Sequence, residues 1–244
     1  MIMIDRKRLI FLTLSVLLSL LIFSFCSCVA RIEGVMSDGG AASVTLVTSL
    51  EPRTLGLLSS IRNFMGESSG TQVLDANSIS RSMAAAPGIQ SVSLKNIGPE
   101  ALEGTISISH VGDFLVSGSD RFIAYTQGRT PGTSSIIISL DLETSPVIIS
   151  MLSPDVMEYL SALMAPAATG ERLTKSEYLD LVSSIYGRPM SDEIAAARIN
   201  AFIEFPRPPS KVTGGNARGR IAEFSVPLVD ILVLDEPLRF EVGW

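Results

Sequence analysis

The sequence contains very few of the side chains that bind transition metals or form disulfides. Its 244 residues include one histidine and two cysteines, and both cysteines lie within the first 28 residues. These counts leave no histidine and cysteine set for zinc or copper, and no cysteine after Cys28 for a disulfide. A calcium site made of oxygen ligands stays open, although no spaced acidic loop indicates one. We expect no metal and no other cofactor.

A strongly basic face is missing as well. The formal net charge is −6, and it becomes −8 without residues 1–27, because that segment carries three basic residues and one acidic residue. Binding to nucleic acid requires a basic surface that neutralises phosphates. We therefore expect no nucleic-acid partner.

The first 27 residues combine a short basic start with a long apolar run. Basic residues occupy positions 6–8, and the apolar run extends over residues 9–25. This order is typical of a secretory signal peptide. We predict a signal peptide at residues 1–27, followed by one extracytoplasmic domain at residues 28–244, which is long enough to bury a full core without disulfides.

The end of the apolar run resembles the lipobox of bacterial lipoproteins, in the relaxed form found in spirochaetes. Ser27 precedes Cys28, and the apolar Phe25 stands three positions before it, whereas Cys26 directly follows Phe25. Cys28 is therefore the better lipid acceptor and Cys26 the poorer one. The resemblance implies acyl chains, such as palmitate, that anchor the protein firmly because more than one chain is attached. The expected location is the cell membrane or outer membrane, facing the periplasm or the cell exterior.

Two other interpretations fit the same segment. Residues 9–30 are long enough to cross the apolar core of a bilayer as an uncleaved signal anchor. A plain secretion signal would instead release the domain. Either the lipoprotein or the uncleaved anchor would leave the domain tethered at a membrane surface.

After Cys28 the hydrophobic pattern changes repeatedly between the strand and helix periods. A hairpin is expected directly after the anchor, and a helical insert near residues 153–198 is expected to form a cap, a lid or a packed layer. Further strands are predicted at residues 90–94, 104–111, 121–127, 134–143, 199–205, 221–226 and 238–244. Helices are predicted at residues 52–65, 75–86, 153–164, 174–187 and 192–198. The fold class is therefore α+β, with a mainly antiparallel sheet and amphipathic helices packed on it.

Catalytic patterns are weak. His110 has Asp113 and Asp120 nearby in sequence, but no serine stands in a nucleophile-elbow pattern, so His110 is interpreted as a polar residue at a strand end. The glycine-rich residues 213–216 precede a strand rather than a helix, which favours a hairpin loop over a phosphate-binding loop. We expect a protein that is not an enzyme, and no catalytic residues are assigned.

The predicted helix at residues 153–164 carries the candidate ligand-binding residues. Met157, Leu160 and Met164 lie on its apolar stripe, and methionine adapts its shape to irregular apolar surfaces. Packing in the core is the default interpretation of such a stripe. The alternative is an adaptable apolar pocket lined by these three residues.

The order of elements after Cys28 resembles the LppM-like family of bacterial lipoproteins. The resemblance is carried by residues 87–92, by the strand at 104–114 and by residues 223–228, and it covers roughly residues 28–115 and the last forty residues. It does not extend to residues 153–198. It implies a compact α/β domain that holds an apolar or lipid-like ligand, with Cys28 as the anchor cysteine.

These observations lead to two hypotheses about function. The first is a membrane-anchored envelope lipoprotein that binds a lipid or another apolar ligand without catalysis. The alternative is an envelope scaffold or assembly factor that binds a protein partner. An apolar pocket of about 300 Å³ or more would favour the first hypothesis, and an exposed apolar patch would favour the second.

Overall fold

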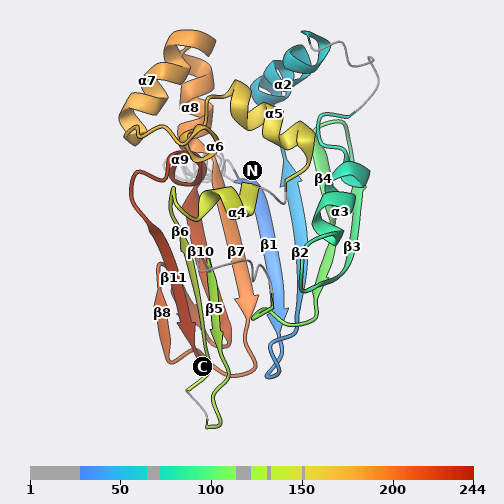
Figure 1. The fold of residues 1–244 in the computed structure, drawn as a ribbon, viewed down its shortest axis with the longest axis vertical. Helices are drawn as coiled ribbons and strands as arrows, with labels where there is room; N and C mark the ends of the chain where they lie inside the picture. The colour runs from blue at the N-terminus through green and yellow to red at the C-terminus, as the bar shows by residue number, and fades with distance from the viewer. Residues whose placement is uncertain (1–27, 65–71, 114–121, 131–132, 150–151) are drawn as a thin grey trace, which may run out of the picture.

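The computed structural model describes residues 28–64, 72–113, 122–130, 133–149 and 152–244 of the chain, and these residues form two sheets and eight helices (Figure 1). The large sheet contains β1 (Cys28–Met36), β2 (Ala42–Ser49), β3 (Ile89–Asn96), β4 (Ala101–Ile108), β7 (Arg198–Glu204), β9 (Asn216–Arg218) and β10 (Ile221–Pro227). The small sheet contains β5 (Ile123–Thr126), β6 (Ser135–Leu140), β8 (Lys211–Thr213) and β11 (Leu238–Gly243). The helices are α2 (Pro52–Phe64), α3 (Ala76–Ala84), α4 (Ser145–Ile149), α5 (Pro154–Ala162), α6 (Pro166–Thr169), α7 (Lys175–Tyr186), α8 (Arg188–Ala196) and α9 (Leu228–Val233).

The strand β1 lies in the middle of the large sheet, whose order is β3-β4-β2-β1-β7-β10-β9. It forms an antiparallel hairpin with β2 and a parallel pair with β7, in which Ile32 is opposite Ala201. All other neighbours in both sheets are antiparallel. This confirms the expected α+β class with mainly antiparallel sheets, and also the hairpin directly after Cys28.

The two sheets pack face to face over one half of the large sheet. Figure 1 shows the small sheet in front of β7 and β10, whereas α3 lies against β3 at the other end of the large sheet. A cluster of buried side chains joins the two sheets: Met36, Phe205 and Ala222 from the large-sheet side, and Ile136, Val242 and Trp244 from the small-sheet side. We call this cluster the sheet core.

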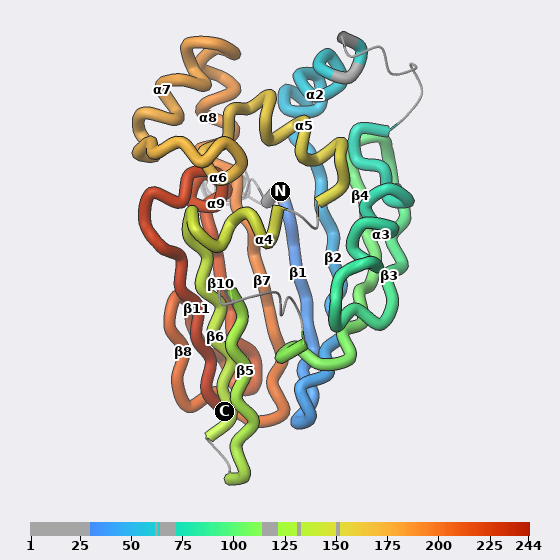
Figure 2. The backbone as a smooth tube through the Cα atoms, in the orientation of Figure 1, coloured from blue at the N-terminus to red at the C-terminus, as the bar shows by residue number. Residues whose placement is uncertain are grey.

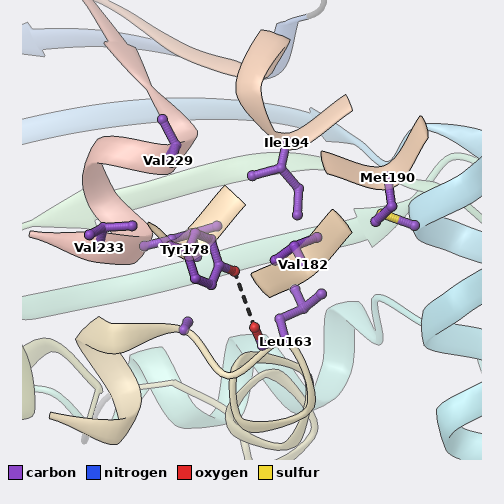
Figure 3. Packing of buried hydrophobic residues seen from close by; sticks show 9 residues of the cluster. Leu163, Tyr178, Val182, Met190, Ile194, Val229 and Val233 are labelled. Carbon is purple, nitrogen blue, oxygen red and sulfur yellow. Dashed lines mark hydrogen bonds between the residues drawn. The ribbon is translucent and has the colours of Figure 1, made fainter. Parts of the chain in front are cut away.

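The helices α5 to α9 gather at one end of the sheets, near the start of β1 (Figures 1 and 2). Their buried side chains form a second cluster, the helical core, which Figure 3 shows from close by. Its members are Leu163, Ala165, Tyr178, Val182, Met190, Ile194, Val229, Leu232 and Val233. The predicted helical insert therefore packs together with α9 around one shared core.

Tyr178 lies at the centre of the helical core. Its side chain is fully buried, and its hydroxyl donates a hydrogen bond of 3.2 Å to the Leu163 carbonyl (Figure 3). Burial raises the pKa of Tyr178 to about 12, because the ionised phenolate would lose its hydration. The same helix begins with the predicted capping box, in which Thr174 and Glu177 satisfy each other's backbone N–H groups.

The glycine-rich residues 213–216 correct one expectation, because they do not close a simple hairpin. The strand before them, β8, pairs with β11 of the small sheet, and the strand after them, β9, pairs with β10 of the large sheet. Gly214 has a positive φ of 76°, and a Cβ at Gly215 would lie 2.4 Å from the Glu223 carbonyl oxygen. These two glycines therefore allow the chain to step directly from one sheet to the other.

Candidate functional site

The space between the two sheets contains an apolar pocket of about 350 Å³, which we call the inter-sheet pocket. All lining residues among those described are Gly, Ala, Val, Ile, Met or Phe, so no polar side chain faces the pocket. The large sheet contributes Ile32, Met36, Val44, Ile199, Ala201, Ile203 and Phe224, and the small sheet contributes Ile136, Ile138, Phe240 and Val242. The pocket therefore offers a ligand only apolar contacts.

The strand period explains why the lining is uniformly apolar. On β7, Ile199, Ala201 and Ile203 point toward the pocket. The alternate positions face the other side of the sheet, because successive side chains of a strand point in opposite directions. There Phe202 contacts the guanidinium of Arg31, whose Cζ lies 4.5 Å from the ring centroid. The same strand thus has one apolar inner face and one solvated outer face.

Small residues at the middle of the large sheet create part of the space. Ala201 on β7 is opposite Ile32 on β1 and Phe224 on β10, and it presents only a methyl group to the pocket. A Cβ at Gly34 would lie 2.7 Å from Cδ1 of Ile203, so Gly34 makes room for that side chain. Larger side chains at Ala201 would extend into the pocket.

An aromatic cluster packs at the end of the strands where Met36 and Phe205 lie. The rings of Phe205 and Trp244 have centroids 4.8 Å apart, and those of Tyr125 and Trp244 are 6.2 Å apart. Trp244 is 1% exposed, and its indole N–H has no hydrogen-bond partner within the described part of the chain. The chain's single tryptophan therefore belongs to the same core as the pocket walls.

The structure does not bring the candidate residues Met157, Leu160 and Met164 into one pocket. Leu160 lines a smaller apolar pocket of about 190 Å³ between α2, α5, α8 and α9. Met157 lines a separate surface hollow beside α4 and α6. Met164 follows α5 with a positive φ of 50°, is half-buried, and lines neither of these nor the inter-sheet pocket.

The predicted lipid acceptor, Cys28, is the first residue of β1 and pairs with Arg198 of β7. Cys26 and the rest of the predicted signal peptide lie outside the described residues. Because β1 also lines the inter-sheet pocket, the anchor position and the pocket belong to the same strand.

The inter-sheet pocket was not predicted from the sequence, although its signals are present. Residues 134–143 and 238–244 show the alternation that places Ile136, Ile138, Phe240 and Val242 on one face. No local pattern says that this face lies opposite β1 and β7. The other signal in the sequence is the presence of small residues, above all Ala201, among the larger apolar residues of these strands, because small side chains leave space.

His110 lies beyond the end of β4 and lines none of the three pockets described above. Its Nδ1 accepts a hydrogen bond of 3.1 Å from the Gly112 N–H and lies 3.7 Å from a carboxylate oxygen of Asp113. Its ring packs edge-on against Tyr125, with centroids 5.1 Å apart. Asp120, the other acid noted in the sequence, lies outside the described residues.

Two cations near residues 213–216, Lys211 and Arg220, have acidic partners. Lys211 forms an ion pair of 2.7 Å with Glu241, and this pair lowers the pKa of the Glu241 carboxyl. Arg220 pairs with Glu204 across β7 and β10. These two cations are therefore matched by carboxylates rather than directed at a common anion site.

Two kinds of feature are absent from the described residues. No group of three or more His, Cys, Asp or Glu side chains in this part of the chain is placed to hold a metal ion. No helix in the same residues combines the length and the hydropathy that crossing a bilayer requires.

Comparisons with known proteins give two distant structural matches. No protein-family model matches the chain, and no curated protein matches it. The chain is similar to the folded domain of LppM from Mycobacterium tuberculosis, solved by NMR, with 9% identity, a TM-score of 0.36, and coverage of 88% of this chain and 86% of that one. It is also similar to part of yeast LTA4 hydrolase in complex with bestatin, with 11% identity and a TM-score of 0.27. That match covers 88% of this chain but 28% of the hydrolase. Similarity at this level transfers neither a ligand nor an activity.

Proposed function

We propose that this protein is an envelope lipoprotein, anchored through Cys28, whose domain binds a lipid or another apolar molecule in the inter-sheet pocket without catalysis. One observation carries the proposal: all the described residues that line this pocket of about 350 Å³ are apolar. Ligand pockets in proteins have volumes of about 300–1,000 Å³ and mainly apolar walls. The inter-sheet pocket lies within this range.

The chemistry of the lining favours an apolar ligand over water or a polar metabolite. A buried water needs two to four polar partners, and the lining supplies no polar side chain. A polar ligand would lose its hydrogen bonds to water without replacement. An apolar ligand gains about 25 cal/mol for each Å² of its surface that is buried.

The membrane location rests on the sequence of the first 28 residues and on the position of β1. The strand β1 begins at Cys28, and Ile32 of the same strand lines the pocket. Four residues of a strand span about 13 Å, so the pocket begins close to the proposed anchor. A short distance between anchor and pocket suits a ligand taken from the bilayer.

The alternative function is an envelope scaffold that binds a protein partner. Exposed large apolar side chains occur at Val35, Val47, Ile97, Ile185 and Ile221. They lie on β1, β2, the β3–β4 connection, α7 and β10, and the two that share one level of the large sheet, Val35 and Ile221, are separated by the charged Glu204. The inter-sheet pocket is the stronger candidate site.

Native mass spectrometry of the full-length chain, released from detergent micelles after incubation with a membrane lipid extract, tests the proposed function. We expect a retained apolar molecule in a one-to-one complex. The variant Ala201→Phe, which projects a ring into the pocket, should lose it. Ser43→Phe adds the same ring at an exposed position on the outer face of β2 and should retain it. Equal retention by both variants, or no retained apolar molecule in either the full-length chain or a Cys28→Ser variant that lacks the acyl chains, would contradict the proposal.

A further inference from the structure

We infer that the inter-sheet pocket takes one unbranched acyl chain, and that the polar head of this ligand stays outside the pocket. This inference rests on the proposed function and narrows its ligand class. It comes from three properties of the pocket: its length along the strands, its volume and the chemistry of its walls.

The pocket is long. Its lining follows the inner face of β7 and continues past it, from Ile199 through Ala201 and Ile203 to Phe205. Six residue steps along an extended chain cover about 20 Å. On the neighbouring β1 the lining runs from Ile32, which is opposite Ala201, to Met36. The space therefore extends about 20 Å along the strands, and its lining also reaches across the large sheet from Ile108 on β4 to Phe224 on β10.

The pocket is also narrow. A volume of about 350 Å³ spread over about 20 Å gives a mean cross-section of about 18 Å². Carbon atoms in non-bonded contact lie about 4 Å apart, so a mean section of this size corresponds to one acyl chain. Two parallel acyl chains or a fused ring system would need a wider space.

The volume sets the approximate length of the chain. An apolar cavity of about 150 Å³ accepts a benzene ring, so about 350 Å³ corresponds to on the order of 14 carbon atoms. An extended zigzag of that many carbons is about 16 Å long, because each bond is about 1.5 Å. This length fits within the lined stretch.

The head group has no place inside. A carboxylate or phosphate moved into an apolar space without a hydrogen-bond donor is strongly unfavourable. The described lining contains no polar side chain. Selectivity should therefore depend on the number and length of the chains and only slightly on the head group.

Two sources can supply a single acyl chain: a free single-chain lipid, or a chain attached to the proposed anchor Cys28. Cys28 pairs with Arg198, and Ile199, at the near end of the pocket, is opposite Ala30. Two residues of β1 span about 7 Å, so a chain attached to Cys28 starts within reach of that end.

Comparing the full-length protein with its Cys28→Ser variant separates the two sources of the acyl chain. Binding of added fatty acid by both proteins indicates a free ligand, and binding by the variant alone indicates the protein's own chain. Both results support a single-chain site, and binding by neither overturns it.

The main experiment titrates the full-length chain in detergent with saturated fatty acids from octanoic to icosanoic acid, read by native mass spectrometry. The Cys28→Ser variant is titrated in parallel. We expect the affinity to rise about fourfold for each added methylene and to stop rising near tetradecanoic acid. A lysophospholipid with the same chain should bind within about threefold of the fatty acid, because its head lies outside. A two-chain phospholipid and a sterol should bind at least tenfold more weakly.

Two variants test the dimensions of the pocket in opposite directions. Ala201→Leu narrows its middle and should move the preferred chain to a shorter length. Ile203→Ala widens and lengthens the space and should move the preference to a longer chain. Ser43→Phe on the outer face should leave the preference unchanged. Because the expected shifts have opposite signs, general destabilisation cannot produce both.

The results separate this inference from the proposed function. Equal binding of two-chain lipids or sterols, or an affinity that keeps rising to icosanoic acid, overturns the single-chain site and leaves apolar ligand binding intact. Failure of every apolar compound to bind overturns both.

Discussion

The helical core and the sheet core use similar aliphatic and aromatic residues, but they are packed differently. In the helical core Ala165, Tyr178, Val182 and Val233 are all 0% exposed. The sheet core borders a pocket of about 350 Å³, although Trp244 and Ala222 nearby are almost fully buried. Protein interiors are normally packed as densely as organic crystals. The four fully buried side chains of the helical core line no part of the pocket of about 190 Å³ beside α2, whereas the sheet core directly borders the larger of these two spaces.

The largest difference between the two cores should appear when an aromatic side chain is removed. Tyr178→Ala should lower the free energy of unfolding by about 3–5 kcal/mol, because it opens a cavity in a filled core. Phe224→Ala should lower it by about 2 kcal/mol or less, because one side of that ring already faces the pocket. Urea unfolding followed by circular dichroism measures both. Equal losses would show that the sheet core is packed as tightly as the helical core.

Adding methyl groups should have opposite effects in the two cores. Ala201→Leu fills part of the pocket and should raise the free energy of unfolding of the delipidated protein by about 1 kcal/mol. Ala165→Leu adds the same group to the filled helical core and should lower it by about 1–3 kcal/mol. Thermal unfolding of the two variants beside the unmodified protein provides the measurement. A loss of stability in both would argue against usable space between the sheets.

Removing a tyrosine hydroxyl should lower the free energy of unfolding more in the helical core than at the exposed edge of the sheet core. Tyr178→Phe loses a buried hydrogen bond of 3.2 Å to the Leu163 carbonyl and should lower the free energy of unfolding by about 1 kcal/mol. Tyr125→Phe loses a 3.3 Å bond to the Asp38 carbonyl at an exposed site, where water replaces the phenol, so its effect should be smaller. Chemical unfolding of both variants compares them. A larger effect at Tyr125 would contradict this ranking.

The smallest expected effect is on the stability of the protein at acidic pH. Hydrogen bonds from Thr174 lower the pKa of Glu177 at the start of α7. A carboxyl whose pKa is lowered by folding stabilises the protein above its unfolded pKa and loses that contribution as the pH falls through the folded value. The unmodified protein should therefore be more stable than Glu177→Gln near neutral pH, and this difference in the free energy of unfolding should shrink below a pH of about 4.5, the usual pKa of glutamate. The described pocket lining has no titratable group, so ligand binding by this site should not follow the same pH course. A constant advantage in unfolding experiments down to strongly acidic pH would rule out the capping role.

Local patterns predicted the elements well because their causes are local. Ser153 followed by Pro154, and the capping box of Thr174 and Glu177, begin helices where the sequence predicts them. The alternation from Leu238 to Trp244 predicts β11, and the structure confirms it. Each signal depends on side chains within one turn or one strand.

The site could not be predicted in the same way, because it depends on pairing between distant segments. The parallel pair of β1 and β7 joins residues about 170 positions apart, and the small sheet must then fold over it. The methionine stripe on α5 drew attention to Met157, Leu160 and Met164, but the structure directs these side chains to different surroundings. Whether any of the three contacts a ligand stays a prediction. The alternation within each strand of the inter-sheet pocket shows which side chains lie on its inner face. It does not show which strands lie opposite that face.

Photo-crosslinking tests the central claim most directly. The full-length chain is irradiated with a long-chain fatty acid that carries a diazirine in its acyl chain, and the modified peptides are identified by mass spectrometry. We predict attachment to peptides containing the inner-face residues of β1, β6 and β7, with strong attenuation in Ala201→Phe and normal labelling in Ser43→Phe. Attachment centred on α5, at Met157, Leu160 or Met164, or labelling unaffected by Ala201→Phe, would contradict the account.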